Sequence, residues 1–393
     1  MPNNETVIYV PGTGGSQLNT YGFLGEDIEA WAAWPAISFD PFSQFSLMPD
    51  GHTPLPPDGK SLHPGDLLKD YFKGPLDALA AQLTATSGRK LITLPFDWRW
   101  DIAINSEVLF NKINQVATAE SPCTLVGFSQ GGLLCRLAWS RLVDLGRQNL
   151  VRRLITIGTP HQGGYSSYEA LTGKNEAFGQ IQRARALGSL GYKEPTVREL
   201  SAVVATWPSI YEMLPLVGGS DAVNDPDRIK LFNASSWNAF FRPSQAWLNW
   251  ALTVFQPVLL ASRYIPPASV LTTAAGTGFE VNTKLVFPGS LGSFDACGAP
   301  TNDGDGTFPV SSCLMPDGDQ WVYTCRHIDL IGAPVWSGDL VNWINDPRAA
   351  PTPPRPAIVN TQPVPPTLFG PPFPDSLGTS PPGSPCRAGK CPC

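Results

Sequence analysis

The feature that most constrains this chain is the motif Gly127-Phe128-Ser129-Gln130-Gly131, which lies between two apolar segments. The residues leading into it read TLVG, and those from its last glycine onward read GGLLCRLAW. A G-x-S-x-G pattern between an apolar strand and an apolar helix is typical of a sharp turn that exposes a serine hydroxyl at the edge of a sheet. An ordinary glycine-rich turn with an incidental serine is the alternative, and the apolar flanks disfavour it. We therefore predict that Ser129 is a nucleophile.

The region around this motif alternates strand and helix patterns. Short apolar, β-branched runs alternate with segments of helical spacing over the first 160 or so residues. Such alternation predicts an α/β fold with a mostly parallel, doubly wound sheet. We expect strands at 6–10, 90–94, 124–127 and 151–157, and helices at 67–84, 107–119 and 131–145.

Changes in composition suggest four parts. We expect a first core part with a lid-like irregular segment, an inserted helical cap, a second core part that carries later strands, and a Pro-rich tail with little to bury. The apolar run 246–262 contains Asn, Gln and Pro, falls short of the ~20 residues of a spanning helix, and reads as a cap or interfacial helix. The expected bounds are 1–165 (lid 20–64), 166–280, 281–346 (strands 284–287 and 321–324, helix 340–344) and 347–393.

Acyl transfer requires backbone N–H groups that stabilise a negatively charged oxygen in the transition state. One should come from Gln130, which follows the nucleophile, and the other from the glycine loop 11–15 after the first strand. A phosphate-binding loop is the competing interpretation. It would require Gly-Lys-Ser/Thr or G-x-G-x-x-G leading into a helix, and neither occurs here.

A catalytic base can be selected among the four histidines of the chain. In this type of fold the acid and then the histidine follow the serine in sequence. His52 and His63 precede Ser129, and His161 directly follows a core strand, where a structural role or a place in the wall of the site is expected. His327 remains as the predicted base.

The acid should lie between Ser129 and His327 on a turn-rich loop. Asp305 lies in such a loop, three residues before Phe308-Pro309, and Asp303 is the second candidate. A calcium loop is an alternative reading of Asp-x-Asp-Gly. However, no further acidic ligand or closing Glu follows.

Composition excludes several classes of function. The net charge is −6 with a pI near 5.3, and no basic run occurs, so we expect no nucleic-acid partner. The N-terminus lacks a signal-peptide pattern and no spanning segment is evident, so a cytoplasmic location is expected. The eight Cys, three of them in the tail, do not match common zinc spacings, so we expect neither a metal nor a cofactor. Charged residues make up only 15% and Trp residues number 12, which indicates either an apolar surface or a large core.

Several segments, in order, resemble motifs of the lecithin:cholesterol acyltransferase-like family, which includes lysosomal phospholipase A2-type enzymes of the α/β-hydrolase fold. They are VPGTGGSQL (10–18), PFDWR (95–99), GFSQGG (127–132), PSIYEMLP (208–215) and GDGTFP (304–309), with His327 following. The resemblance covers about residues 6–345. It implies an α/β-hydrolase fold with a Ser129–Asp305–His327 triad, and an oxyanion N–H from Gly14. It also implies lipid or phospholipid ester substrates, with hydrolysis or acyl transfer as the outcome and contact with a membrane surface.

Two departures from the family pattern limit this resemblance. No Cys precedes Cys123, so the disulfide that closes the lid in eukaryotic members cannot form here. The Pro-rich tail has no counterpart in the family. Two other functions therefore remain open: an enzyme acting on a non-lipid ester or lactone, and a non-catalytic binding protein whose tail engages a partner.

Overall fold

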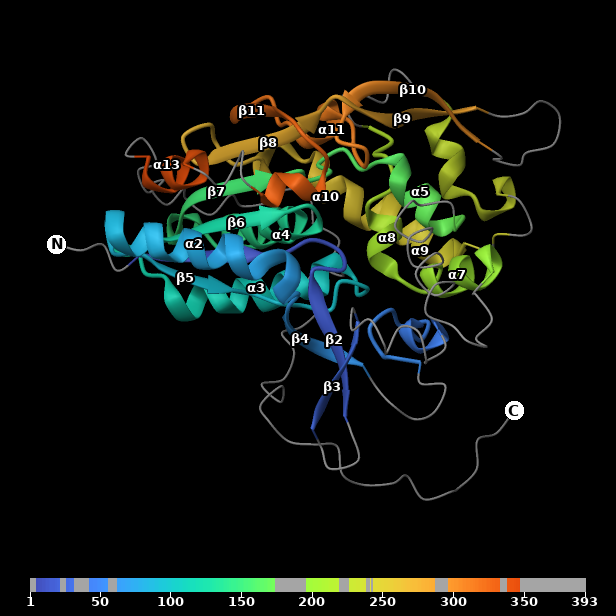
Figure 1. The fold of residues 1–393 in the computed structure, drawn as a ribbon. Helices are drawn as coiled ribbons and strands as arrows, with labels where there is room; N and C mark the ends of the chain where they lie inside the picture. The colour runs from blue at the N-terminus through green and yellow to red at the C-terminus, as the bar shows by residue number, and fades with distance from the viewer. Residues whose placement is uncertain are drawn as a thin grey trace.

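A six-stranded, wholly parallel sheet forms the centre of the protein in a computed structural model (Figure 1). The strand order is β11-β8-β7-β6-β1-β5. The bounds are β1 Thr6–Val10, β5 Lys90–Thr93, β6 Cys123–Phe128, β7 Val151–Ile157, β8 Leu271–Thr277 and β11 Asp319–Thr324. The structure describes residues 5–21, 26–31, 42–55, 62–173, 196–218, 226–237, 241, 243–286, 296–332 and 338–346.

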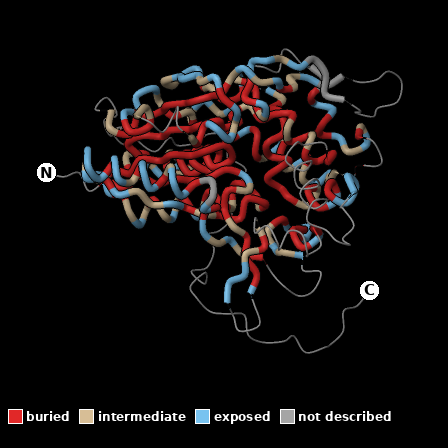
Figure 2. The backbone as a smooth tube through the Cα atoms, viewed as in Figure 1, coloured by how far each residue is buried: buried red, intermediate tan, exposed pale blue. Residues whose placement is uncertain are grey.

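Alternating side chains of the sheet divide the core into two halves. Ile8 and Leu125 belong to the cluster that contains α3 (Ile102–Val116) and α4 (Gln130–Asp144). Val7 and Val126, their sequence neighbours, pack with α2 (Lys69–Ser87) and α13 (Asp339–Asn345). Because successive strand residues point to opposite faces, one apolar run serves both helix layers. The result is a three-layer fold whose sheet is buried on both sides (Figure 2).

A set of short helices forms a cap beyond the carboxyl ends of β6 and β7 (Figure 1). They are α5 Tyr165–Leu171, α7 Val197–Val204, α8 Pro208–Glu212, η4 Pro226–Phe232, η5 Ala234–Ser236, α9 Gln245–Trp250, the π-helical η6 Ala251–Phe255, α10 Gln256–Leu260 and η7 Ser262–Tyr264. The expected cap, 166–280, extends too far, because β8 within it pairs with β7 in the central sheet. β8 reads LTTAAGT, and its small residues gave no strong strand signal.

The expected return of residues 284–287 to the sheet is also wrong. Residues 284–286 lie in β9 (Phe279–Val286), which pairs antiparallel with β10 (Ala296–Gly304) in a separate hairpin; Phe287 lies outside the described residues. An apolar β-branched run indicates a strand but does not say which sheet it joins. The expected strand at 321–324 does return, as the edge strand β11.

The lid-like segment is more regular than predicted. β2 (Ser16–Tyr21), β3 (Asp27–Trp31) and β4 (His63–Leu67) form a three-stranded antiparallel sheet, and η1 (Phe42–Phe45) follows β3. Figure 1 shows the β2–β3 pair extending away from the main body. Residues 22–25, 32–41 and 56–61, which the same prediction covered, lie outside the described residues.

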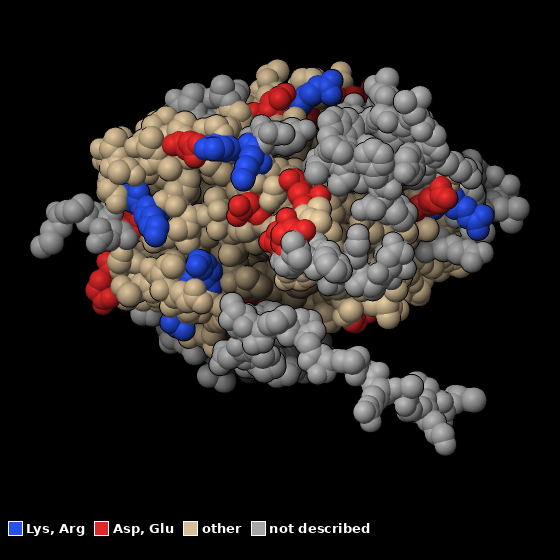
Figure 3. Space-filling view, turned by 60° about the horizontal axis from the view of Figure 1, so that its bottom comes forward, with Lys and Arg blue, Asp and Glu red and all other residues tan. Residues whose placement is uncertain are grey.

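Five of the ten described Trp side chains are buried, four are half-buried and one is exposed. Only Trp321 is classed as exposed, whereas Trp98, Trp139 and Trp207 are almost fully buried. The high Trp content therefore reflects a large core more than an apolar surface. Charged side chains form small separate groups on the largely neutral face in Figure 3. Within the described ranges, no helix is both long and apolar enough to cross a membrane, and the tail 347–393 is outside them.

Candidate active site

Ser129 occupies a strained turn between β6 and α4. Its φ of 52° and ψ of −124° make it the one non-glycine residue with positive φ in the part of the chain that the structure describes. Backbone strain of this kind persists only where the surroundings impose it. A Cβ on Gly127 would lie 2.5 Å from Gly132 Cα, and one on Gly131 would lie 2.3 Å from Val10 O. These two glycines let the strand, the turn and the helix approach closely enough to hold the serine.

Hydrogen bonds fix the backbone of this turn. The Ser129 N–H donates to Ile157 O at 2.8 Å, and the Ser129 carbonyl accepts from Gly132 N at 3.0 Å. The N–H of Gln130 begins α4, where the first backbone N–H groups have no partner within the helix and the helix dipole is positive. The turn therefore places a hydroxyl next to a positively polarised helix end.

His327 and Asp305 form a close pair. His327 Nδ1 lies 2.6 Å from Asp305 Oδ2, and the His327 backbone N–H donates to Asp305 O at 2.9 Å. The other carboxylate oxygen, Oδ1, accepts from the N–H groups of Thr307 at 2.9 Å and Phe308 at 2.7 Å. Since Asp305 is 1% exposed and both of its oxygens are bonded, its carboxylate has a fixed orientation toward the imidazole.

The imidazole of His327 lies over the strand ends that carry the serine. The ring of Phe128, the residue before Ser129, is centred 5.0 Å from the His327 ring. A Cβ on Gly158 would lie 2.9 Å from His327 Cε1, and Gly158 follows Ile157, which accepts the Ser129 N–H. Phe308 packs edge-on against the same imidazole, at 5.3 Å between centroids. The structure thus pairs two of the predicted site residues, Asp305 and His327, and places their imidazole against Phe128, the residue before the third, Ser129.

The other candidates lie elsewhere. Asp303 is exposed, and Thr277 Oγ1 donates to it at 3.2 Å. His63 pairs with Asp27 at 3.0 Å on the exposed three-stranded sheet, and His52 is bonded to Asp50. His161 is buried between Thr156 and Arg136, and burial, followed by the Arg136 charge, lowers its pKa.

The glycine loop after β1 meets the nucleophile turn directly. A Cβ on Gly12 would lie 2.7 Å from Ser129 Cβ, and Thr13 Oγ1 donates to Gln130 Oε1 at 2.7 Å. Gly14 has φ +72°, and its carbonyl accepts from Trp31 Nε1 at 2.9 Å. Gly12 and Thr13 therefore contact the turn, while the contacts of Gly14 lead toward the three-stranded sheet.

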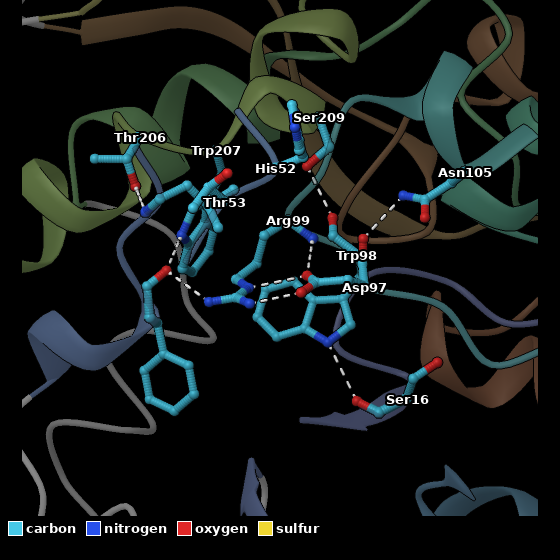
Figure 4. A network of polar contacts seen from close by, with 12 residues as sticks. Ser16, His52, Thr53, Asp97, Trp98, Arg99, Asn105, Thr206, Trp207 and Ser209 are labelled. Carbon is cyan, nitrogen blue, oxygen red and sulfur yellow. Dashed lines mark hydrogen bonds and ion pairs between the residues drawn. The ribbon is translucent and has the colours of Figure 1, made fainter. Parts of the chain in front are cut away.

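The Gln130 side chain extends this contact into the cap. Its Nε2 donates to Trp98 O at 3.1 Å. Ser209 Oγ of α8 donates to the same carbonyl at 2.8 Å (Figure 4). Thr13, Gln130, Trp98 and Ser209 thus form a continuous chain from the glycine loop to the cap. The sequence analysis missed this role of Thr13 and of the Gln130 side chain, and only their motif positions could have suggested it.

A buried ion pair supports the same region. Arg99 contacts Asp97 twice, Nε–Oδ1 at 2.9 Å and Nη2–Oδ2 at 2.5 Å, and both side chains are almost fully buried (Figure 4). Arg99 Nη1 and Trp207 Nε1 both donate to Phe45 O, at 3.1 and 2.7 Å. The PFDWR segment therefore joins core, lid and cap and does not contact the reacting atoms.

Two buried acidic residues, Asp101 and Glu212, also join the core and the cap. Asp101 caps α3 by accepting from Ala103 N, while Glu212 accepts from Ile102 N and from Trp250 Nε1, each at 2.8 Å. Burial raises the pKa of Glu212 well above its usual value, and the nearby Asp101 charge raises it further. The two carboxyl groups are hydrogen-bonded to each other. No sequence pattern pointed to this pair.

The cysteines near the site are thiols. Cys123, Cys135, Cys313 and Cys325 are all buried and unbridged, so a disulfide of Cys313 with Cys325 is excluded. The side chain of Cys297 lies outside the described residues. Among the described side chains, no three His, Cys, Asp or Glu residues gather as metal ligands.

Comparison with known proteins supports a hydrolase. The family model described as palmitoyl protein thioesterase matches residues 100–203, which include Ser129 but neither Asp305 nor His327. No curated protein matches the chain by sequence.

Solved structures show the fold more completely. A chain of the Tle4–Tli4 complex is 11% identical, with a TM-score of 0.55, over 86% of this chain and 96% of that one. Weaker matches include the mature lipase BlEst2 of Bacillus licheniformis (15% identical, 87% and 93% covered, TM-score 0.37) and EstA of Clostridium botulinum (12%, 90% and 89%, TM-score 0.39). The predicted fold class is confirmed, and the family match supports the predicted ester-hydrolysing enzyme. This chain has the α/β-hydrolase fold.

Proposed function

We propose that the protein is a serine ester hydrolase in which Ser129, His327 and Asp305 act as nucleophile, base and orienting acid. One observation carries the proposal: the 2.6 Å contact between His327 Nδ1 and Asp305 Oδ2, in which the imidazole also packs against Phe128, the residue before the strained Ser129. With Nδ1 held by the carboxylate, Nε2 is the nitrogen that exchanges a proton with Ser129.

The reaction proceeds in two halves. Ser129 Oγ forms a bond to the ester carbonyl carbon while its proton passes to His327 Nε2. The tetrahedral intermediate then loses the alcohol, whose oxygen takes the proton from Nε2, and the acyl group remains on Ser129. A water molecule repeats these steps, and the acid product leaves the serine with its hydroxyl restored.

Two backbone N–H groups stabilise the developing oxyanion. Gln130 provides one from the start of α4. We assign the second to Thr13 in preference to Gly14, because Thr13 contacts Gln130 and the neighbouring Gly12 lies against Ser129. Thr13 is exposed, so a substrate can reach its backbone.

The acyl group is proposed to be a long fatty chain. Two findings support this choice: the palmitoyl protein thioesterase match and the ordered motifs similar to those of lipid acyltransferases and phospholipases. Contact with a lipid surface and binding of a partner by the tail remain proposals of the same kind.

Hydrolysis of a p-nitrophenyl ester series with increasing chain length, by the wild type and Ser129→Ala, tests this function. We expect Ser129-dependent turnover that increases with chain length and on neutral phospholipid vesicles. Turnover of short soluble esters alone would favour a non-lipid substrate. Absence of both turnover and fluorophosphonate labelling would favour a non-catalytic binding protein.

A further inference from the structure

Two buried side chains hold the glycine loop that follows β1. The indole Nε1 of Trp98 donates to Ser16 O at 3.2 Å, where the loop enters β2 (Figure 4). The Gln130 side chain, at the start of α4, accepts from Thr13 Oγ1 at 2.7 Å, inside the loop. Trp98 is 1% exposed and Gln130 is fully buried, so both bonds are shielded from water. The position of the loop beside the nucleophile therefore depends on these two residues.

The Trp98 carbonyl sets the direction of the hydrogen bonds that lead to Thr13. Gln130 Nε2 donates to Trp98 O at 3.1 Å. A backbone carbonyl can only accept, so it selects the amide nitrogen of Gln130 and turns Oε1 toward Thr13. The Thr13 hydroxyl must then donate, as it does. A reversed amide would place two acceptors, Gln130 Oε1 and Trp98 O, against each other.

The cap holds this carbonyl in place. Ser209 Oγ donates to Trp98 O at 2.8 Å, and Ser209 has no exposed surface (Figure 4). Trp207, which directly precedes α8, packs its ring edge-on against the Trp98 indole, with 5.1 Å between the ring centroids. The cap therefore contacts Trp98 at both its carbonyl and its ring, and a displacement of α8 would release the residue to which the glycine loop is tied.

We propose that Ser209 of the cap is a positioning residue for the oxyanion hole. Its hydroxyl holds the Trp98 carbonyl, which orients the Gln130 amide. The amide in turn holds Thr13, whose backbone N–H is assigned to the oxyanion. This inference rests on the proposed function. Donors stabilise a developing oxyanion best when they are fixed before the reaction, so the oxyanion hole is complete only when α8 is seated on Trp98.

A pair of serine variants in the cap tests the inference. Ser209→Ala removes the hydroxyl that holds Trp98 O. Ser201→Ala is the matched control, because Ser201 of α7 is also buried and donates to a backbone carbonyl, that of Leu171 in α5, at 2.5 Å. Both variants lose the same kind of hydrogen bond, but the bond of Ser201 lies wholly within the cap. Steady-state kinetics with a p-nitrophenyl ester and urea unfolding are measured for both.

We expect a decrease in kcat for one variant only. Ser209→Ala should lower kcat about fivefold and leave KM within about twofold, because the lost hydrogen bond acts on the transition state and not on substrate binding. Ser201→Ala should keep the wild-type kcat while it loses a similar amount of stability. General loosening of the cap would instead change the kinetics of both variants alike.

A double-mutant cycle with Thr13→Val shows whether Ser209 acts through Thr13. The two substitutions interrupt one chain of hydrogen bonds, so Thr13→Val/Ser209→Ala should again lose about fivefold in kcat, whereas independent effects would multiply to about 25-fold. Thr13→Val/Ser201→Ala should show the loss of Thr13→Val alone.

Equal kcat values for Ser209→Ala and Ser201→Ala would overturn the inference, and so would losses that multiply in the double variant. Either result leaves the Ser129-dependent turnover of the wild type, and with it the proposed function, intact. Absence of both ester turnover and fluorophosphonate labelling in the wild type would overturn the proposed function together with this inference.

Discussion

The nucleophile turn and the joint between core and cap are both buried, but they are held by different forces. At Ser129 the geometry comes from the backbone: glycines allow close approach, and a short sheet hydrogen bond fixes the turn. At the joint, buried polar groups such as Asp97, Arg99, Asp101 and Glu212 connect segments far apart in sequence. The first region should therefore tolerate side-chain removal without unfolding, whereas the second should not.

The largest effect is expected at Ser129. Ser129→Ala should lower kcat by about 10⁴- to 10⁶-fold, since triad members act as a unit, with little change in the midpoint of thermal unfolding. Ser129→Gly should be equally inactive and about 1 kcal/mol more stable, because glycine removes the strain of a positive φ. Ester turnover and urea unfolding measure the two quantities. Normal turnover by Ser129→Ala would refute the nucleophile assignment.

His327 and His161 offer a matched pair. His327→Gln should lose about 10³-fold or more in kcat with native stability. His161→Gln should keep kcat, but it should lower stability by about 1–3 kcal/mol because its buried partner Thr156 loses a hydrogen bond. Kinetics and urea unfolding of both variants check this. If His161→Gln were the inactive variant, the base would be misassigned.

Breaking the buried ion pair between Asp97 and Arg99 should mainly lower the stability of the protein. Arg99→Met leaves the Asp97 carboxylate buried without its partner, which should cost about 3–5 kcal/mol in the free energy of unfolding. The double variant Asp97→Asn/Arg99→Met should recover part of this loss. Urea denaturation measures both, and a single variant as stable as wild type would contradict the account.

The acidic pair Asp101–Glu212 should make stability depend on pH. The folded-state pKa of Glu212 is raised, so the folded protein keeps a proton that the unfolded chain releases above its usual pKa of 4.5. The stabilising contribution of the pair to the free energy of unfolding is therefore full below pH 4.5. It is lost progressively as the pH rises toward the folded-state pKa of Glu212.

Asp101→Asn should flatten that decline. Asparagine is also a good N-cap residue, and its amide can donate to Glu212, which then ionises with a lower pKa. The measurement is the unfolding midpoint against pH for the variant and wild type. Parallel curves would show that the pair does not share a proton.

The smallest effect is expected at Thr13. Thr13→Val removes the hydroxyl that donates to Gln130 and keeps the backbone N–H. A loss of about 1 kcal/mol in transition-state stabilisation corresponds to roughly a fivefold decrease in kcat, with an unchanged unfolding midpoint. Single-turnover kinetics resolve such a change, and a decrease confined to KM would argue against an orienting role.

The sequence predicted the central sheet well where the elements have strong local patterns. The strands at 6–10 and 151–157 have the expected bounds, because β-branched apolar runs bounded by loops are distinctive. The helix α3 begins at Ile102 and not at 107, since its N-cap Asp101 lies directly after a Trp-rich segment and was not recognised as a helix start. Weak strands such as β8 were lost in the predicted cap.

The candidate site also contains residues that local sequence patterns indicate and residues that depend on tertiary packing. Ser129 and Asp305 could be selected from local motifs, and His327 from its order after them and by elimination of the other histidines. The pairing of Glu212 with Asp101 spans more than 100 residues and depends on how the cap packs on α3, which no local pattern encodes. For the same reason Thr13 became evident only from its contact with Gln130.

Trapping the acyl-enzyme tests the central claim most directly. The protein is mixed with a long-chain p-nitrophenyl ester, quenched in acid within the first turnover, and digested for mass spectrometry. We predict an acyl group on the peptide that contains Ser129, no adduct in Ser129→Ala, and greatly slowed adduct formation in His327→Gln. An adduct on another residue, or steady turnover by Ser129→Ala, would contradict the account.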